Sequence, residues 1–144
     1  LGAREVIRTW WKERVGHDDS VAVGDAALEA PVLDNGSGLS RKERISANAM
    51  ARLLQTAYRS PLMSELMSSL PISGVDGTLR RSKSKNTGSA HLKTGTLRDV
   101  SAVAGYVDGV SGKRYVLVAI ANHSNAQAAR PAFDALIDWT VKDQ

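Results

Sequence analysis

Cysteine is absent from the 144 residues, which excludes a disulfide framework and thiol chemistry. Long apolar runs are absent as well, since none approaches the ~20 residues that a helix needs to span a bilayer. Aromatic residues make up only 5% of the chain, and none lies within the basic run at residues 80–85. We therefore expect no nucleic-acid binding. The length suffices for one domain with a core and is too short for two.

The composition is that of an ordinary globular domain, with 42% apolar and 24% charged residues. Much of the net charge of +4 comes from Arg80-Arg-Ser-Lys-Ser-Lys85, in a setting rich in Gly, Ser and Asn. Such a run is typical of a solvated loop. The alternative is a non-enzymatic basic module that binds an anionic polymer through these four charges.

Apolar residues recur at helical spacing in four stretches. They predict a helix over about residues 3–15, a second that starts at the N-cap Ser46 and extends to Tyr58, and a short third that starts at Ser60-Pro61. A fourth helix is expected from about Pro131 to Val141. Residues 17–30 show no period, and we expect a loop there with a short strand near Val21.

Three strands are predicted, over about residues 89–97, 100–108 and 114–121. The connections between them are short, and the second contains the glycines of a hairpin loop, which favours an antiparallel meander. The predicted order is helices first, then three strands, then one helix, which is typical of an α+β layer arrangement. Three strands are few for so many helices, and we expect the chain to be a piece of something longer.

The strand over residues 89–97 contains His91-Leu-Lys-Thr-Gly-Thr-Leu97. A Lys-Thr-Gly triplet places a positive charge, a hydroxyl and a position of close backbone approach on one strand edge. It is the third signature element of serine β-lactamases and penicillin-binding proteins, beside S-x-x-K and S-D-N. Alone it is a weak signal, because three residues match by chance in many proteins.

The neighbouring motifs strengthen that signal. Asp34-Asn-Gly-Ser-Gly-Leu-Ser-Arg41 comes first, then the helix from Ser46, then Leu70-Pro-Ile-Ser-Gly-Val-Asp-Gly-Thr-Leu79, the Lys-Thr-Gly strand and Val103-Ala-Gly-Tyr106. In this order the chain closely resembles the D-alanyl-D-alanine carboxypeptidase/endopeptidases of the type-4, class C low-molecular-mass penicillin-binding proteins. The resemblance covers nearly the whole chain.

The resemblance implies that residues 1–144 are the C-terminal portion of one penicillin-recognising domain, whose five-stranded antiparallel sheet is flanked by helices. The nucleophilic serine and its lysine belong to the missing N-terminal portion. Ser82-Lys-Ser-Lys85 matches S-x-x-K as text, but it lies in a Gly/Ser-rich loop instead of opening a buried helix. Ser46-Ala-Asn48 matches S-x-N at a helix start that the family places after its own S-D-N, so we reject both strings.

The resemblance assigns catalytic roles to Lys93, Thr94, Gly95 and Thr96. Lys93 supplies positive potential, the hydroxyls of Thr94 and Thr96 bind the substrate carboxylate, and the Thr96 N–H forms half of an oxyanion hole. Gly95 keeps the strand edge open, so that substrate lies along it as an added strand.

Two further residues complete the expected substrate site. By the same resemblance, Arg41 is expected to recognise the polar end of the stem-peptide side chain; the alternative is that it caps or bridges its own turn. Leu97 is expected to line the same pocket. Ser37 and Ser40 are expected to stabilise the turn that precedes Arg41.

The implied parent is a periplasmic serine-type D-Ala-D-Ala carboxypeptidase with no metal or organic cofactor. Its expected partners are peptidoglycan stem peptides ending in D-Ala-D-Ala, β-lactam antibiotics and the missing N-terminal half of the domain. A serine β-lactamase fragment is the nearer alternative, because it shares the triplet. Alone, the fragment is expected to be inactive and, with an open strand edge, to self-associate.

Overall fold

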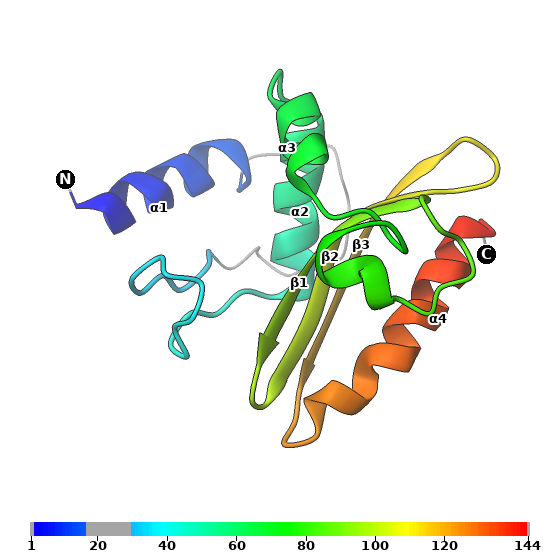
Figure 1. The fold of residues 1–144 in the computed structure, drawn as a ribbon. Coiled ribbons are helices and arrows are strands. Elements are labelled where there is room, and N and C mark those ends of the chain that lie inside the picture. Colours follow the sequence, from blue (N-terminus) through cyan, green and yellow to red (C-terminus); the bar gives the residue numbers. More distant parts are fainter. Residues whose placement is uncertain (1, 17–29, 144) are drawn as a thin grey trace. The chain divides into compact units, whose positions relative to one another are not determined.

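The computed structural model describes residues 2–16 and 30–143, so the short strand expected near Val21 lies outside the described residues. The chain divides into two compact units, Leu1–Thr56 and Ala57–Gln144 (Figure 1). None of the described helices is both long and apolar enough to cross a bilayer.

The first unit contains helix α1 (Ala3–Arg14) and most of helix α2 (Ala47–Tyr58), close to the bounds expected from periodicity. Trp11 and Val15 are buried together with Ala49 of α2, and Ile45 and Leu53 pack against this cluster. The side chain of Ser46 accepts a hydrogen bond from the Ala49 N–H at 3.1 Å. Ser46 is therefore the N-cap that the sequence predicts.

The second unit is built on an antiparallel sheet of strands β1 (Ala90–Leu97), β2 (Val100–Asp108) and β3 (Arg114–Asn122) in the order β1-β2-β3. The predicted strands, their order and the α+β class are confirmed. In the register of β1 and β2, Leu92 lies opposite Gly105 and Lys93 opposite Ala104. The hairpin between β2 and β3 closes through a hydrogen bond from the Gly109 N–H to the Lys113 carbonyl at 2.8 Å.

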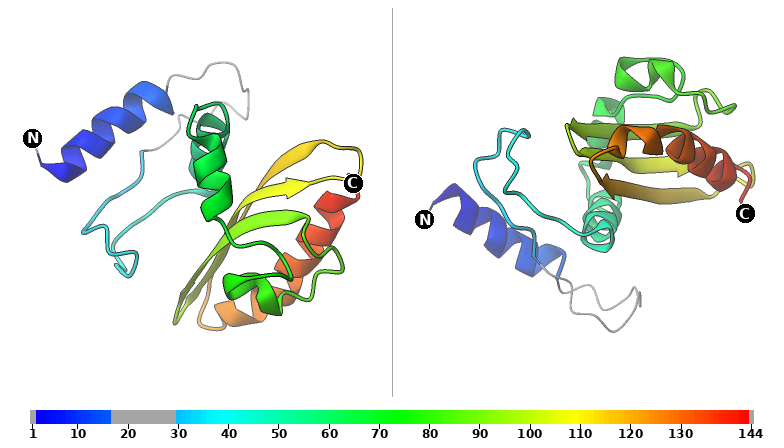
Figure 2. Two further views of the ribbon diagram at one scale, coloured as in Figure 1. Left: turned by 45° about the horizontal axis from the view of Figure 1, so that its top comes forward. Right: turned by 90° about the horizontal axis from the view of Figure 1, so that it is seen from below.

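Helix α4 (Arg130–Val141) follows the short 3-10 helix η2 (Ala126–Ala129) and lies across one face of the sheet (Figure 2). Alternate side chains of the strands point to this face and form the core with α4. The buried core residues are Leu79, Ala90, Leu92, Val103, Val107, Leu117, Ile137 and Val141. On the other face, the ring of Tyr58 packs against that of Tyr106, with centroids 5.8 Å apart.

Helix α3 (Met63–Ser69) begins later than predicted. Its N-cap is Leu62, not Ser60. The Ser60 hydroxyl oxygen accepts the N–H of Leu62 at 3.2 Å, as a capping serine does, but the turn that this bond stabilises lies ahead of the helix. The prediction of a helix start at Ser60-Pro61 was therefore wrong by about one half-turn. A 3-10 helix, η1 (Gly77–Arg81), then leads towards β1.

Candidate active site

The outer edge of β1 is divided into a covered half and an open half. The Leu92 N–H donates to the Pro71 carbonyl and the Ser73 N–H to the Ala90 carbonyl, each at 2.9 Å. Ile72 forms a β-bridge with His91. Within the described part of the second unit, this backbone pairing ends at Leu92. The Lys-Thr-Gly residues that follow therefore lie on an open strand edge.

The direction of the backbone groups along this open edge follows from strand geometry. Both the N–H and the C=O of a strand residue point to the same side, and successive residues alternate. Because the Leu92 N–H and the Ala90 carbonyl point outwards, the N–H and C=O groups of Thr94 and Thr96 point outwards as well. Lys93 and Gly95 direct their backbone groups towards β2. The edge thus presents two N–H donors and two carbonyl acceptors.

Lys93 brings a positive charge to the same edge. Its side chain is exposed, and Nζ donates a hydrogen bond to the carbonyl oxygen of Thr94 at 2.8 Å. An ammonium group carries three protons, so two remain for other acceptors. Gly95 beside it is exposed, and a Cβ there would meet only the Ala102 side chain at 3.7 Å.

The hydroxyl of Thr94 has a partner that the sequence motifs did not single out. Its Oγ1 lies 2.7 Å from Oγ1 of Thr78, a residue of η1. Thr94 is half-buried, whereas Thr96 two residues on is exposed. The only sequence signal for Thr78 is its place in the Asp-Gly-Thr-Leu string, whose role cannot be deduced without the fold.

The far end of the strand is fixed through its backbone. Gln127 of η2 donates through Nε2 to the carbonyl oxygens of Leu97 and Val100, at 3.0 and 3.2 Å. The His123 N–H also donates to the Asp99 carbonyl at 3.0 Å. The turn between β1 and β2 is therefore held to η2 and to the segment just before it, and the Leu97 side chain is half-buried.

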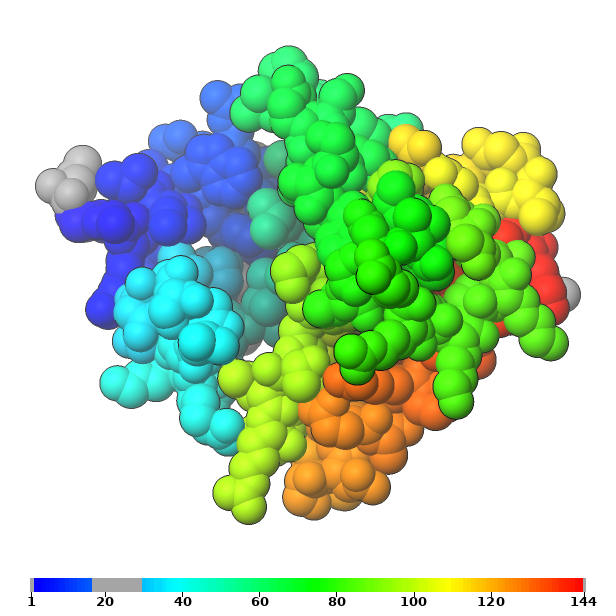
Figure 3. All heavy atoms as spheres, in the orientation of Figure 1, coloured from blue at the N-terminus to red at the C-terminus, as the bar shows by residue number. Residues whose placement is uncertain are grey.

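The basic segment over residues 80–85 is fastened to α4. Ser82 donates to Asp134 at 2.6 Å and Ser84 to Asp138 at 2.7 Å, and Asp138 also accepts from the Lys85 N–H at 2.9 Å. Figure 3 shows the green surface of this region against the orange of α4. The Ser82 hydroxyl thus donates to a carboxylate on α4, which agrees with rejecting Ser82-Lys-Ser-Lys85 as the nucleophile motif.

These hydrogen bonds also affect the pKa of Asp138. Partial desolvation acts to raise the pKa of its carboxyl, but hydrogen bonds from Ser84, Asn86 and the Lys85 N–H, together with the charge of Lys142, outweigh it. The pKa of Asp138 therefore lies below its usual value. Lys83 and Lys85 are exposed, while Ser82 and Ser84, which alternate with them, hold the segment to the helix.

Arg41 lies in the first unit, in a loop closed by the β-bridge between Val32 and Arg44. Ser37 and Ser40 stabilise this loop as expected: the Ser37 hydroxyl accepts the Leu39 N–H at 3.1 Å, and the Ser40 hydroxyl donates to Asp34 at 2.8 Å. Arg41 is exposed, and its carbonyl oxygen accepts a hydrogen bond from the Arg44 guanidinium at 2.7 Å. Its place in one site with Lys93 remains a prediction.

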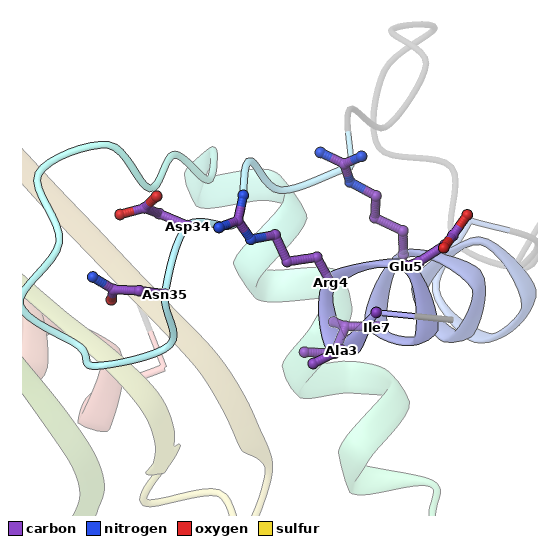
Figure 4. Close-up of a pocket in the computed structure, with 8 residues that line it drawn as sticks. Ala3, Arg4, Glu5, Ile7, Asp34 and Asn35 are labelled. Carbon is purple, nitrogen blue, oxygen red and sulfur yellow. The ribbon is translucent and has the colours of Figure 1, made fainter.

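A surface hollow in the first unit lies between α1 and this loop (Figure 4). Ala3, Arg4 and Ile7 line it from the helix, and Asp34 and Asn35 line it from the loop. None of the predicted catalytic residues is among its lining residues. No group of metal-ligating side chains occurs among residues 2–16 and 30–143.

Comparison with known proteins identifies the fold. The chain matches penicillin binding protein 4 of Haemophilus influenzae, in a structure complexed with a novel β-lactam, with a TM-score of 0.63 and 26% identity over 74% of this chain and 28% of that one. It matches a penicillin G-acylated predatory endopeptidase of Bdellovibrio bacteriovorus with a TM-score of 0.69 and 18% identity, over 99% of this chain and 38% of that one. The class is that of penicillin-binding peptidases.

Sequence comparison places the chain within that class. Residues 10–142 match the model of the D-Ala-D-Ala carboxypeptidase 3 (S13) family. The D-alanyl-D-alanine carboxypeptidase of Actinomadura sp. (strain R39) is 33% identical over 123 residues, which are 81% of this chain and 23% of the relative. The chain belongs to this carboxypeptidase family, and the resemblance to type-4 penicillin-binding proteins is confirmed. It spans about a quarter of the length of this relative.

Proposed function

We propose that this chain is part of a serine-type D-alanyl-D-alanine carboxypeptidase/endopeptidase that cleaves peptidoglycan stem peptides through an acyl-enzyme. Its contribution is the Lys-Thr-Gly strand, and the nucleophile comes from another part of the longer protein. The observation that carries the proposal is the open half of β1, where outward-pointing groups of Thr94 and Thr96 lie beside the ammonium of Lys93. Membership of the carboxypeptidase family supports it.

The open edge suits an extended peptide with a free carboxylate. Such a peptide pairs with the outward N–H and C=O groups of Thr94 and Thr96 as an added strand. The carboxylate at its end lies within the positive field of Lys93 and accepts from the two threonine hydroxyls. The Thr96 N–H donates to the carbonyl oxygen under attack, and one such donor typically lowers the barrier by ~3 kcal/mol.

The covalent chemistry needs a serine that this strand does not carry. The serine oxygen attacks the carbonyl of the penultimate D-alanine, the peptide bond breaks, and the terminal D-alanine leaves with the proton on its amine. Water then hydrolyses the ester. A β-lactam reacts by the same attack, but its amine stays attached after the ring opens. In support, a relative at 26% identity has been determined as a β-lactam complex.

Arg41 and Leu97 complete the proposed substrate site. A guanidinium binds a carboxylate bidentately, which suits the polar end of a diamino-acid side chain in the stem peptide. Leu97 is proposed to add an apolar contact to the substrate at the end of the Lys-Thr-Gly strand. Because the proposed substrate is peptidoglycan, we propose a periplasmic location, and the enzyme is proposed to need no metal or organic cofactor.

Labelling with a fluorescent penicillin, followed by a denaturing gel, tests the proposal. The full-length protein should be labelled, and the isolated chain should not. Lys93→Ala should lower the labelling rate by about 10- to 100-fold, because a hydrogen bond to a charged group contributes about 1.5–3 kcal/mol. Lys93→Arg, which keeps the charge, should lose less.

The competing functions give different outcomes. A labelled band from the isolated chain would mean that its nucleophile lies within residues 1–144. Unchanged labelling of Lys93→Ala would favour a basic module, whose polymer binding should fall with salt and disappear when Arg80, Arg81, Lys83 and Lys85 are neutralised. Rapid turnover of the bound penicillin would favour a β-lactamase.

A further inference from the structure

Thr78 contacts the Lys-Thr-Gly strand through its hydroxyl, 2.7 Å from that of Thr94. From this contact we infer that Thr78 is a positioning residue, which orients the hydroxyl proton of Thr94 towards a carboxylate bound at the open edge. The inference deepens the proposed function and rests on it, because that carboxylate belongs to the proposed substrate. Thr78 acts through Thr94 and is not itself a reacting group.

The backbone around Thr78 fixes its position. The Asp76 carboxylate accepts the Ile72 N–H at 2.6 Å, and the Leu79 carbonyl accepts the Gly74 N–H at 3.1 Å. The side chain of Leu79, the next residue, is only 5% exposed and belongs to the core. The residues before and after Thr78 are therefore fixed in place, and they hold the Thr78 backbone, although the Thr78 side chain is exposed.

Gly77 allows this placement. Its φ of +50° is a conformation that side chains disfavour, and a Cβ there would lie 3.1 Å from the Pro71 ring. Pro71 is also the residue whose carbonyl pairs with Leu92 on the edge of β1. The segment that covers the first half of the strand edge thus also turns back and brings Thr78 to the start of the open half.

The direction of the hydrogen bond follows from the chemistry of the ligand. A carboxylate only accepts, so Thr94 must donate its single proton to bind one. The oxygen of Thr94 then has lone pairs directed elsewhere, and Thr78 can donate to one of them. A hydroxyl that accepts such a bond becomes a stronger donor to an anion. Without Thr78, the Thr94 proton is free to turn to water.

The test compares variants of the full-length protein by their rates of acylation. Thr78→Val removes the hydroxyl and keeps the shape, Thr78→Ser keeps the hydroxyl, and Thr87→Val is the control at another exposed threonine. Each is measured with a β-lactam that has a free carboxylate and with its methyl ester. Thr78→Val should slow the carboxylate reaction by about 3- to 10-fold and leave the ester reaction unchanged. Thr78→Ser and Thr87→Val should match the wild type.

A double-mutant cycle with Thr94→Val separates positioning from mere packing. In the Thr94→Val background, Thr78→Val should have no further effect on the carboxylate reaction. Equal losses for acid and ester, additive effects in the cycle, or a wild-type rate for Thr78→Val would each overturn the inference. If Thr78→Val does not fold, Thr78→Ala takes its place. A wild-type protein that no β-lactam acylates would refute the proposed function, and this inference with it.

Discussion

Gly105 on β2 lies directly opposite Leu92, the residue that precedes Lys93, and we predict that Gly105→Ala disrupts the pairing of these strands. A Cβ at Gly105 would lie 2.2 Å from the His91 carbonyl oxygen and 3.0 Å from the Leu92 Cα. Real Cβ atoms almost never come closer than 3.0 Å to another atom. Because both neighbours are backbone atoms, no side-chain rotation relieves the contact, and β1 must move away from β2.

Two costs combine at this position. Overpacking against a fixed neighbour costs about 1–3 kcal/mol. The φ of +152° at Gly105 belongs to a region that is essentially restricted to glycine, and a strained backbone there costs about 1–3 kcal/mol more. The expected loss in the free energy of unfolding is therefore about 2–6 kcal/mol, a large part of the 5–15 kcal/mol that is typical of a folded domain.

Two other glycines of the same sheet separate these costs. Gly112 in the β2–β3 hairpin has a φ of +81° with open space around it, so Gly112→Ala should lose only about 1–2 kcal/mol of backbone strain. Gly95 lacks a positive φ and has room for a methyl group. Gly95→Ala should therefore leave stability unchanged or raise it by about 0.4–1 kcal/mol, while it slows acylation of the full-length protein by obstructing the edge.

Urea unfolding followed by circular dichroism gives the three free energies. The expected order of stability is Gly95→Ala, then Gly112→Ala, then Gly105→Ala. If Gly105→Ala unfolds at the wild-type urea concentration, the close approach of β1 and β2 is wrong. If Gly112→Ala loses as much as Gly105→Ala, backbone strain alone accounts for the loss and the contact with His91 contributes nothing.

Two further predictions concern the rest of the second unit. Because the pKa of Asp138 is lowered by folding, its carboxylate contributes stability above its unfolded-state pKa, and that contribution is lost as the pH falls below about 4. The Lys85 amide, whose N–H donates to Asp138, should be less protected from hydrogen exchange in Asp138→Asn and in the wild type at low pH, when each observed rate is compared with the unprotected rate at the same pH. Equal protection under all conditions would contradict this. Among the described residues, β3 pairs on one side only and has a largely apolar sequence, so the isolated chain should sediment as concentration-dependent oligomers, whereas a stable monomer would contradict this.

Strand and helix periodicity was sufficient to predict the elements of the second unit. The predicted strands agree with β1, β2 and β3 to within one residue at each end. The reason is that apolar runs bounded by turn residues such as glycine indicate where a strand begins and ends. The start of α3 was less predictable. Ser60-Pro61 suits a helix cap, but the same serine hydroxyl can stabilise a turn, and only the path of the chain decides between them.

The placement of the candidate residues was predictable where they share one strand. Lys93, Thr94, Gly95 and Thr96 are consecutive, so a single strand assignment places all four on one edge. Thr78 and Gln127 were missed for the opposite reason. Each lies far from the strand in sequence and acts by one hydrogen bond to it, which no spacing in the chain encodes.

The first half of β1 belongs to the folded core, and the second half is proposed to bind the substrate. In the first half, Ala90 and Leu92 are fully buried, and the Ala90 carbonyl and the Leu92 N–H are bonded to the segment at Pro71–Ser73. In the second half, Lys93, Gly95 and Thr96 are exposed, and the outward backbone groups pair with no other backbone segment in the described part of the second unit, although the Thr94 carbonyl accepts from Lys93 Nζ. A strand edge that is open along its whole length would invite pairing with other chains, whereas a short open stretch beside a fixed one limits the partner to a short peptide. The segment that ends the covered half also carries Thr78, so the boundary between the two halves is itself part of the proposed site.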